Sequence, residues 1–96
     1  MMKRTPSVDG AEVSFVLPIA ECPDGASVVG DFNGWDPEAH PLRRRSNGTR
    51  SVKLRLEPGC YRFKYLLHGG EWRNEDDADR HESNEWGQLD SVLDIG

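Results

Sequence analysis

Two segments in the middle of the chain alternate between apolar and polar residues. Residues 50–56 place three apolar side chains on one face: Val52, Leu54 and Leu56. Residues 60–67 repeat the pattern with a more aromatic set: Tyr61, Phe63, Tyr65 and Leu67. Because successive strand residues point to opposite faces, one set in each segment must face the core. The pattern predicts two strands joined by a turn, with the aromatic set inside and Lys64 on the outward side.

Shorter strand patterns lie on either side of this pair. Residues 12–17 alternate in the same way, and further short strands are expected at residues 26–29, 41–45 and 91–95. No long stretch has the periodicity of a helix. About seven short antiparallel strands with turns between them are typical of an all-β, immunoglobulin-like β-sandwich.

The remaining segments carry no strand pattern. Residues 1–8 are expected to form a flexible N-terminal tail before a single domain at residues 9–96. The polar and acidic residues 74–85 are expected to form a solvated loop. Arg43, Arg44 and Arg45 are interpreted as solvated residues on an exposed strand.

Composition narrows the possible partners and compartment. The net charge is -5, with 17 acidic against 12 basic residues, which argues against a nucleic-acid partner. The chain has no apolar run long enough to cross a bilayer, and its start lacks the apolar region of a secretory signal. We therefore expect a cytoplasmic protein without a membrane partner.

The sequence contains few groups arranged for chemistry. The histidines lack metal-ligand spacing, and the acidic residues 75–79 lack the pattern of a calcium loop, so no metal or cofactor is expected. Cys22 and Cys60 are expected to be free thiols, with a disulfide between them as the alternative. No catalytic set is recognisable, which indicates a protein that is not an enzyme. A small enzyme that uses the acidic loop is the least favoured hypothesis.

The three tryptophans, in contrast, favour binding. Trp35, Trp72 and Trp86 all lie in or beside turns rather than inside strands, which indicates an exposed aromatic platform. In the turn of residues 30–37, the glycines are expected to shape the chain so that Phe32 packs inward and Trp35 faces out. A flat indole covers the apolar face of a sugar ring, while polar side chains satisfy its hydroxyls. The same residues suit a proline-rich peptide, so this pattern alone leaves both ligands open.

Several motifs, in the right order, resemble a known family. They are VGDFNGWD at residues 29–36, LEPG at 56–59, YRFKY at 61–65, Trp72, and NEWGQLDSVL at 84–93. Together they resemble the family-48 carbohydrate-binding modules, which are early-set glycogen-binding domains. Such modules occur in the AMP-activated protein kinase beta subunit and before the catalytic barrels of isoamylases and glycogen branching enzymes. The resemblance runs from about Val13 to Ile95.

The resemblance implies a function and a set of site residues. It implies non-catalytic binding of α-1,4-glucan, such as glycogen, starch or maltooligosaccharide. Trp35 and Trp72 would stack on glucose rings and Trp86 would be a third contact. Lys64, Asp90 and Gln88 would bond to sugar hydroxyls. The alternative is a protein-interaction module or accessory subunit that docks a glucan-metabolising enzyme or kinase.

The chain departs from the family pattern at three places. Asp90 stands where the family has an asparagine, and it replaces an amide with a group that only accepts hydrogen bonds. Gly70 is an insertion before Trp72, and Glu75-Asp76 replaces an Asp-Pro pair after it. The last two changes bear on whether Trp72 stands opposite Trp35.

Overall fold

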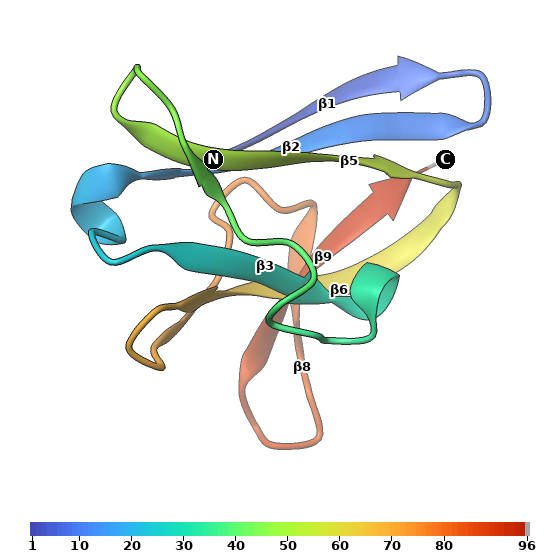
Figure 1. Ribbon diagram of the computed structural model, residues 1–96. Coiled ribbons are helices and arrows are strands. Elements are labelled where there is room, and N and C mark those ends of the chain that lie inside the picture. The colour runs from blue at the N-terminus through green and yellow to red at the C-terminus, as the bar shows by residue number, and fades with distance from the viewer. Residues whose placement is uncertain (96) are drawn as a thin grey trace.

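The computed structural model describes residues 1–95, which fold into two antiparallel β-sheets packed face to face (Figure 1). The first sheet has the strand order β1 (Met2–Ser7), β2 (Gly10–Pro18), β5 (Thr49–Leu56) and β4 (Arg43–Arg44). The second has the order β3 (Ala26–Gly30), β6 (Gly59–Leu67), β9 (Leu89–Ile95) and β8 (Arg80–Ser83), and β7 (Trp72–Arg73) also pairs with β6. The prediction of an all-β sandwich is confirmed, with more strands than the seven expected.

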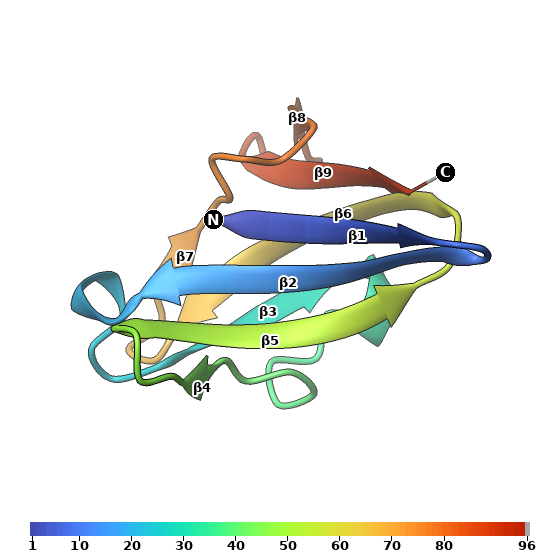
Figure 2. The ribbon, with the colours of Figure 1, turned by 90° about the horizontal axis from the view of Figure 1, so that it is seen from above.

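The core lies between the two sheets and is built by the alternation described above. Val13, Phe15 and Leu17 of β2 face Phe63 and Tyr65 of β6, and all five side chains are buried. The rings of Phe15 and Phe63 meet edge to face with centroids 5.2 Å apart, a preferred aromatic geometry. Figure 2 shows β2 and β5 lying over β3 and β6, with β9 beyond β1. The predicted inward faces of the central strands are therefore confirmed.

Two short 3₁₀ turns complete the described residues, η1 (Ile19–Glu21) and η2 (Asp31–Asn33). Each is three residues long, so within residues 1–95 no helix is long and apolar enough to cross a membrane. The two cysteines are free thiols, with Cys22 buried and Cys60 exposed.

The N-terminal residues correct one expectation. In place of a flexible tail over residues 1–8, Met2–Ser7 form the edge strand β1 along β2, in a register that pairs Met2 with Phe15 and Ser7 with Gly10. All side chains of β1 after Met2 are exposed. Backbone hydrogen bonds to β2, together with contacts of Arg4 to the Asp94 carbonyl and to Asp79, hold this strand, and such bonds leave no hydrophobic pattern in the sequence.

Residues 74–85 are a second correction. Arg80–Ser83 of this segment form β8, which pairs with β9. Glu75, expected in a solvated loop, is 1% exposed. Its carboxylate accepts a hydrogen bond of 2.6 Å from the buried Tyr65 hydroxyl. The burial of a charged group is possible here because the core supplies a polar partner.

The connection between β3 and β5 crosses from one sheet to the other. Pro41 forms a single bridge with Ser27 of β3, and Arg43–Arg44 then pair with β5 of the opposite sheet. Leu42, between them, is buried. The arginines are exposed on this short edge strand, as predicted.

Candidate functional site

The six residues singled out from the sequence line one open cleft of about 640 Å³. It lies on the outward side of the sheet that contains β6, opposite the face that packs in the core. The lining residues are Asp31, Trp35, Arg62, Lys64, Trp72, Ser83, Asn84, Glu85, Trp86, Gln88 and Asp90. The structure thus brings together side chains from η2 and its turn, β6, β7, and the β8–β9 hairpin.

The three tryptophans differ in exposure. Trp35 is half-buried, Trp72 is 47% exposed and Trp86 is 79% exposed. These are the three tryptophans of the chain, and all of them line the cleft. Large apolar side chains gathered on one exposed surface are a mark of a binding site.

Trp35 is mounted on a tightly bonded turn after β3. Asn33 closes this turn: its Oδ1 accepts from the Gly30 amide at 3.0 Å, and its Nδ2 donates to the Val28 carbonyl at 3.0 Å. Gly34 and then Trp35 adopt positive φ angles of 65° and 59°. Among residues 1–95, Trp35 is the only non-glycine residue with a positive φ, a conformation that costs roughly 1 kcal/mol or more. The surrounding turn therefore imposes the direction of this side chain.

Asp31 fixes the indole ring itself. Its Oδ1 accepts a 2.9 Å hydrogen bond from Trp35 Nε1, and its Oδ2 accepts one of 2.9 Å from the Arg62 amide of β6. One carboxylate therefore joins the aromatic ring to the strand that forms the floor of the cleft. Phe32, next in the chain, packs against Phe15 with ring centroids 5.6 Å apart, as expected for an inward anchor.

Two glycines, Gly69 and Gly70, shape the turn between β6 and β7 that precedes Trp72. Gly69 and Gly70 have φ angles of 126° and 96°, and the Leu67 amide donates to the Glu71 carbonyl across the turn at 2.8 Å. Trp72 then pairs with Leu66, whose side chain points to the outward face of β6. With this turn, Trp72 lines the same cleft as Trp35.

The segment after Trp72 is held by a polar anchor. Asn74 Nδ2 donates to the Leu89 carbonyl at 3.0 Å, and its Oδ1 accepts from Ser91 Oγ at 2.9 Å. The Glu75 amide donates to the same Ser91 Oγ at 2.8 Å. These bonds fix the end of β7 to β9, so the replacement of the family's Asp-Pro pair does not leave the segment loose.

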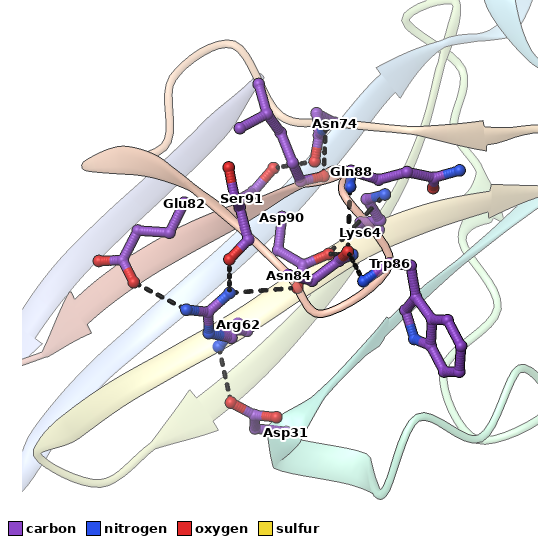
Figure 3. A network of polar contacts seen from close by, with 12 residues as sticks. Asp31, Arg62, Lys64, Asn74, Glu82, Asn84, Trp86, Gln88, Asp90 and Ser91 are labelled. Carbon is purple, nitrogen blue, oxygen red and sulfur yellow. Dashed lines mark hydrogen bonds and ion pairs between the residues drawn. The ribbon is translucent and has the colours of Figure 1, made fainter.

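Trp86 lies at the tip of the β8–β9 hairpin, which Asn84 organises. The Asn84 Oδ1 accepts from the amides of Trp86 at 2.9 Å and Gln88 at 3.1 Å, and its Nδ2 donates to Asp90 Oδ1 at 3.1 Å (Figure 3). Gln88 is exposed at this tip. The Asn84 side chain therefore adds to the backbone hydrogen bonds of the tip and ties the tip to the floor of the cleft.

Asp90 is the centre of an ionic network in that floor. Its side chain is buried between Lys64, with Nζ 3.7 Å from Oδ1, and Arg62, with Nη1 3.4 Å from Oδ2 (Figure 3). Arg62 Nη2 also contacts Glu82 Oε1 at 2.8 Å. A hydrogen bond from Arg80 lowers the pKa of Glu82, so this carboxylate is ionised at neutral pH.

Lys64 lies on the outward side of β6, as the alternation predicts, yet it is only 7% exposed. Its stem is covered by the cleft walls while its ammonium group reaches the polar floor. The sequence reasoning missed Asp31 and Arg62 as site residues. The sequence could have indicated Arg62, because it lies two positions before Lys64 and its side chain therefore points to the same outward face of the strand.

The sequence of this domain matches a known protein family. Residues 22–96 match the model of the family described as the glycogen recognition site of AMP-activated protein kinase. The chain belongs to this family. The predicted family resemblance is thereby confirmed, and the motifs around Trp35, Lys64 and Trp72 fall inside the matched range.

Relatives of this chain are much longer proteins. It is 52% identical over 42 residues to the 1,4-alpha-glucan branching enzyme GlgB 2 of Xanthomonas campestris pv. campestris (strain 8004), covering 43% of this chain and 6% of the enzyme. It is 40% identical over 48 residues to the chloroplastic protein FLOURY ENDOSPERM 6 of Oryza sativa subsp. japonica, covering 50% of this chain and 9% of that protein. The chain therefore spans less than a tenth of the length of these relatives.

A solved structure has the same fold as this chain. The crystal structure of a maltogenic amylase from S. marinus superimposes over 100% of this chain and 16% of the amylase chain, with a TM-score of 0.79. The sequence identity is 19%, so this likeness concerns the fold alone.

Proposed function

We propose that the cleft binds an α-1,4-glucan chain without catalysing a reaction on it. The observation that supports this most strongly is the gathering of Trp35, Trp72 and Trp86 around one open cleft that also contains hydrogen-bonding side chains. Flat indoles suit the apolar faces of glucose rings, and a polar floor suits their hydroxyl rims. The family to which the chain belongs and the branching enzymes among its relatives point to the same ligand class.

Each residue has a role in this proposal. Trp35, fixed by Asp31, and Trp72, on its strand, stack on neighbouring glucose rings. Trp86 makes a third contact from the hairpin tip. Lys64 donates to hydroxyls, Asp90 accepts from them and Gln88 does either. A few stacked rings with few buried hydrogen bonds give a Kd on the order of micromolar to millimolar.

Titration with maltoheptaose or β-cyclodextrin, followed by tryptophan fluorescence and calorimetry, tests the proposal. We expect saturable binding, which Trp35→Ala weakens by about tenfold or more without unfolding the domain. Val8→Ala is a suitable control because this side chain is 97% exposed at the turn between β1 and β2. No signal at millimolar ligand with folded protein would contradict glucan binding. A large loss of thermal stability in Trp35→Ala would instead make Trp35 a structural cap.

The non-catalytic part has its own test. Incubation with maltooligosaccharides should release no reducing sugar above a blank without protein. Release that scales with the concentration of purified protein would contradict it.

The alternative function is docking to a glucan-metabolising enzyme or kinase. It is favoured by one observation: the relatives that match this chain contain the matching region within much longer proteins, including branching enzymes. Pull-down from native lysate, with and without soluble glycogen, separates the two functions. A partner retained equally with and without glycogen would support docking.

A further inference from the structure

Both cations that line the cleft are already paired with carboxylates. Lys64 lies beside one oxygen of Asp90, at 3.7 Å, and Arg62 lies beside the other, at 3.4 Å. The second terminal nitrogen of Arg62 contacts Glu82 at 2.8 Å. Within the described residues that line the cleft, no lysine or arginine therefore presents a charge without an acidic partner.

The Asp90 carboxylate is fixed in this position. Its side chain is 7% exposed, and its Oδ1 also accepts a hydrogen bond from Asn84 Nδ2 at 3.1 Å. Separating this buried carboxylate from its cations would leave Lys64 without an acidic partner and would remove one of the two acidic partners of Arg62, which is unfavourable for buried charges. A ligand that needs Lys64 or Arg62 must therefore compete with a preformed ion pair.

The remaining charge of the cleft is negative. Asp31, Glu85 and Asp90 line it together with only two cations, Arg62 and Lys64. Glu82, behind Arg62, is paired with Arg80, so this outer pair leaves the negative balance of the lining residues unchanged. Hydroxyl groups tolerate this environment, because they can donate hydrogen bonds to carboxylates. A phosphate monoester carries about -1.5 to -2 charges at pH 7 and offers mainly acceptors, so it is repelled.

We propose that the cleft selects glucan chains without phosphate groups, and that Asp90 is the residue that determines this selectivity. The inference rests on the proposed function, that the cleft binds α-glucan. Asp90 acts in two ways: it neutralises the two cations that could bind a phosphate, and it adds negative charge to the floor.

A matched pair of ligands tests the proposal on the wild-type protein. Maltopentaose is compared with maltopentaose that carries one phosphate monoester on its central glucose, at pH 7. Whichever two neighbouring rings stack in the cleft, the phosphorylated ring is one of them or is bonded to one of them. We expect the phosphorylated chain to bind about tenfold or more weakly at low ionic strength, with the difference shrinking as salt is added.

Two variants then assign the cause. Asp90→Asn keeps an oxygen for Asn84 but removes the acidic partner of Lys64 and one of the two acidic partners of Arg62. We therefore expect the ratio of the two affinities to move by about tenfold toward the phosphorylated chain. Glu85→Gln also removes one negative charge from the cleft, but Glu85 is not a partner of Lys64 or Arg62. This control variant should therefore change the ratio by less than about threefold. Measuring ratios separates selectivity from general changes in affinity.

The outcomes separate the inference from the proposed function. If both ligands bind the wild-type protein equally, glucan binding stands and the selectivity is overturned. If neither binds, the proposed function fails and the selectivity fails with it. If Asp90→Asn leaves the ratio unchanged, or Glu85→Gln changes it as much, the assignment to Asp90 is wrong. The wild-type comparison decides the selectivity even if Asp90→Asn does not fold.

Discussion

Two tyrosines on β6 offer a direct test of how the core holds its buried carboxylate. The Tyr65 hydroxyl donates to Glu75 Oε1 at 2.6 Å, and both side chains are buried. The Tyr61 hydroxyl donates to the Glu57 carbonyl at 2.7 Å near the surface. Replacing each tyrosine by phenylalanine keeps the ring and removes one hydrogen bond. The two variants therefore differ mainly in the charge and burial of the acceptor.

The expected magnitudes follow from these differences. A hydrogen bond to a charged group contributes about 1.5–3 kcal/mol, and loss of all partners of a buried charge costs about 3–5 kcal/mol. In Tyr65→Phe, Glu75 keeps the Asp77 amide at 2.9 Å and the Met1 amino group at 3.0 Å. We therefore expect Tyr65→Phe to lose about 2 kcal/mol of unfolding free energy, which lowers Tm by roughly 8–16 °C. Tyr61→Phe should lose about 0.5 kcal/mol.

Thermal unfolding and urea titration, both followed by circular dichroism, measure the two losses. The comparison is made at neutral pH with the wild-type protein in parallel. Equal losses in the two variants, or a loss below about 0.5 kcal/mol in Tyr65→Phe, would refute the reasoning that burial and charge set the strength of this bond.

Three further expectations concern other contacts. Burial and a neighbouring carboxylate raise the pKa of Tyr65 above its usual value of 10.0, so the unfolded chain ionises first. Stability should thus be constant just below pH 10 and fall as pH rises beyond it, and urea titrations of Tyr65→Phe should show a shallower fall. Asn84→Ala removes the acceptor for the Trp86 amide, so hydrogen exchange of that amide should accelerate by about threefold or more while Tm changes by only a few degrees. Unchanged exchange would mean that the hairpin holds its tip without Asn84. Gly30→Ala would place a Cβ 2.5 Å from the Arg62 carbonyl oxygen, and the backbone must shift at a cost of about 1–3 kcal/mol. A wild-type Tm in this variant would show that β3 and β6 separate easily there.

The sequence was most informative for strands whose side chains alternate between the core and the surface. The alternation in β5 and β6 predicted the core faces, because a period of two leaves only one face for the apolar set. It was uninformative for β1 and β8, whose polar side chains lie mostly at the surface. Such edge strands are selected by hydrogen bonding to a neighbouring strand, which composition does not record. The burial of Glu75 could not be predicted for a similar reason, since it depends on a hydrogen bond from Tyr65 of another strand.

The candidate site was also only partly predictable from the sequence. Trp35, Lys64 and Trp72 were found from turn placement and motif likeness, and the structure collects them on one cleft. The bonds that hold them were not predictable. Asp31 joins Trp35 to β6 only because the turn folds back on that strand. Asp90, noted at first as a lost donor, became important once its two cations were placed beside it.

The walls of the cleft come from three segments that are far apart in the chain, around Trp35, Trp72 and Trp86. A glucan chain that contacts all three would act as a reversible cross-link between the β3 turn, β7 and the β8–β9 hairpin. Even a weak ligand would then stabilise the fold by mass action, by about 2.7 kcal/mol at one hundred times its Kd. The gain should appear mainly as slower opening of the hairpin, whose tip is the most exposed of the three segments. Binding of a sugar would thus reduce the mobility of the β8–β9 hairpin at the edge of the second sheet.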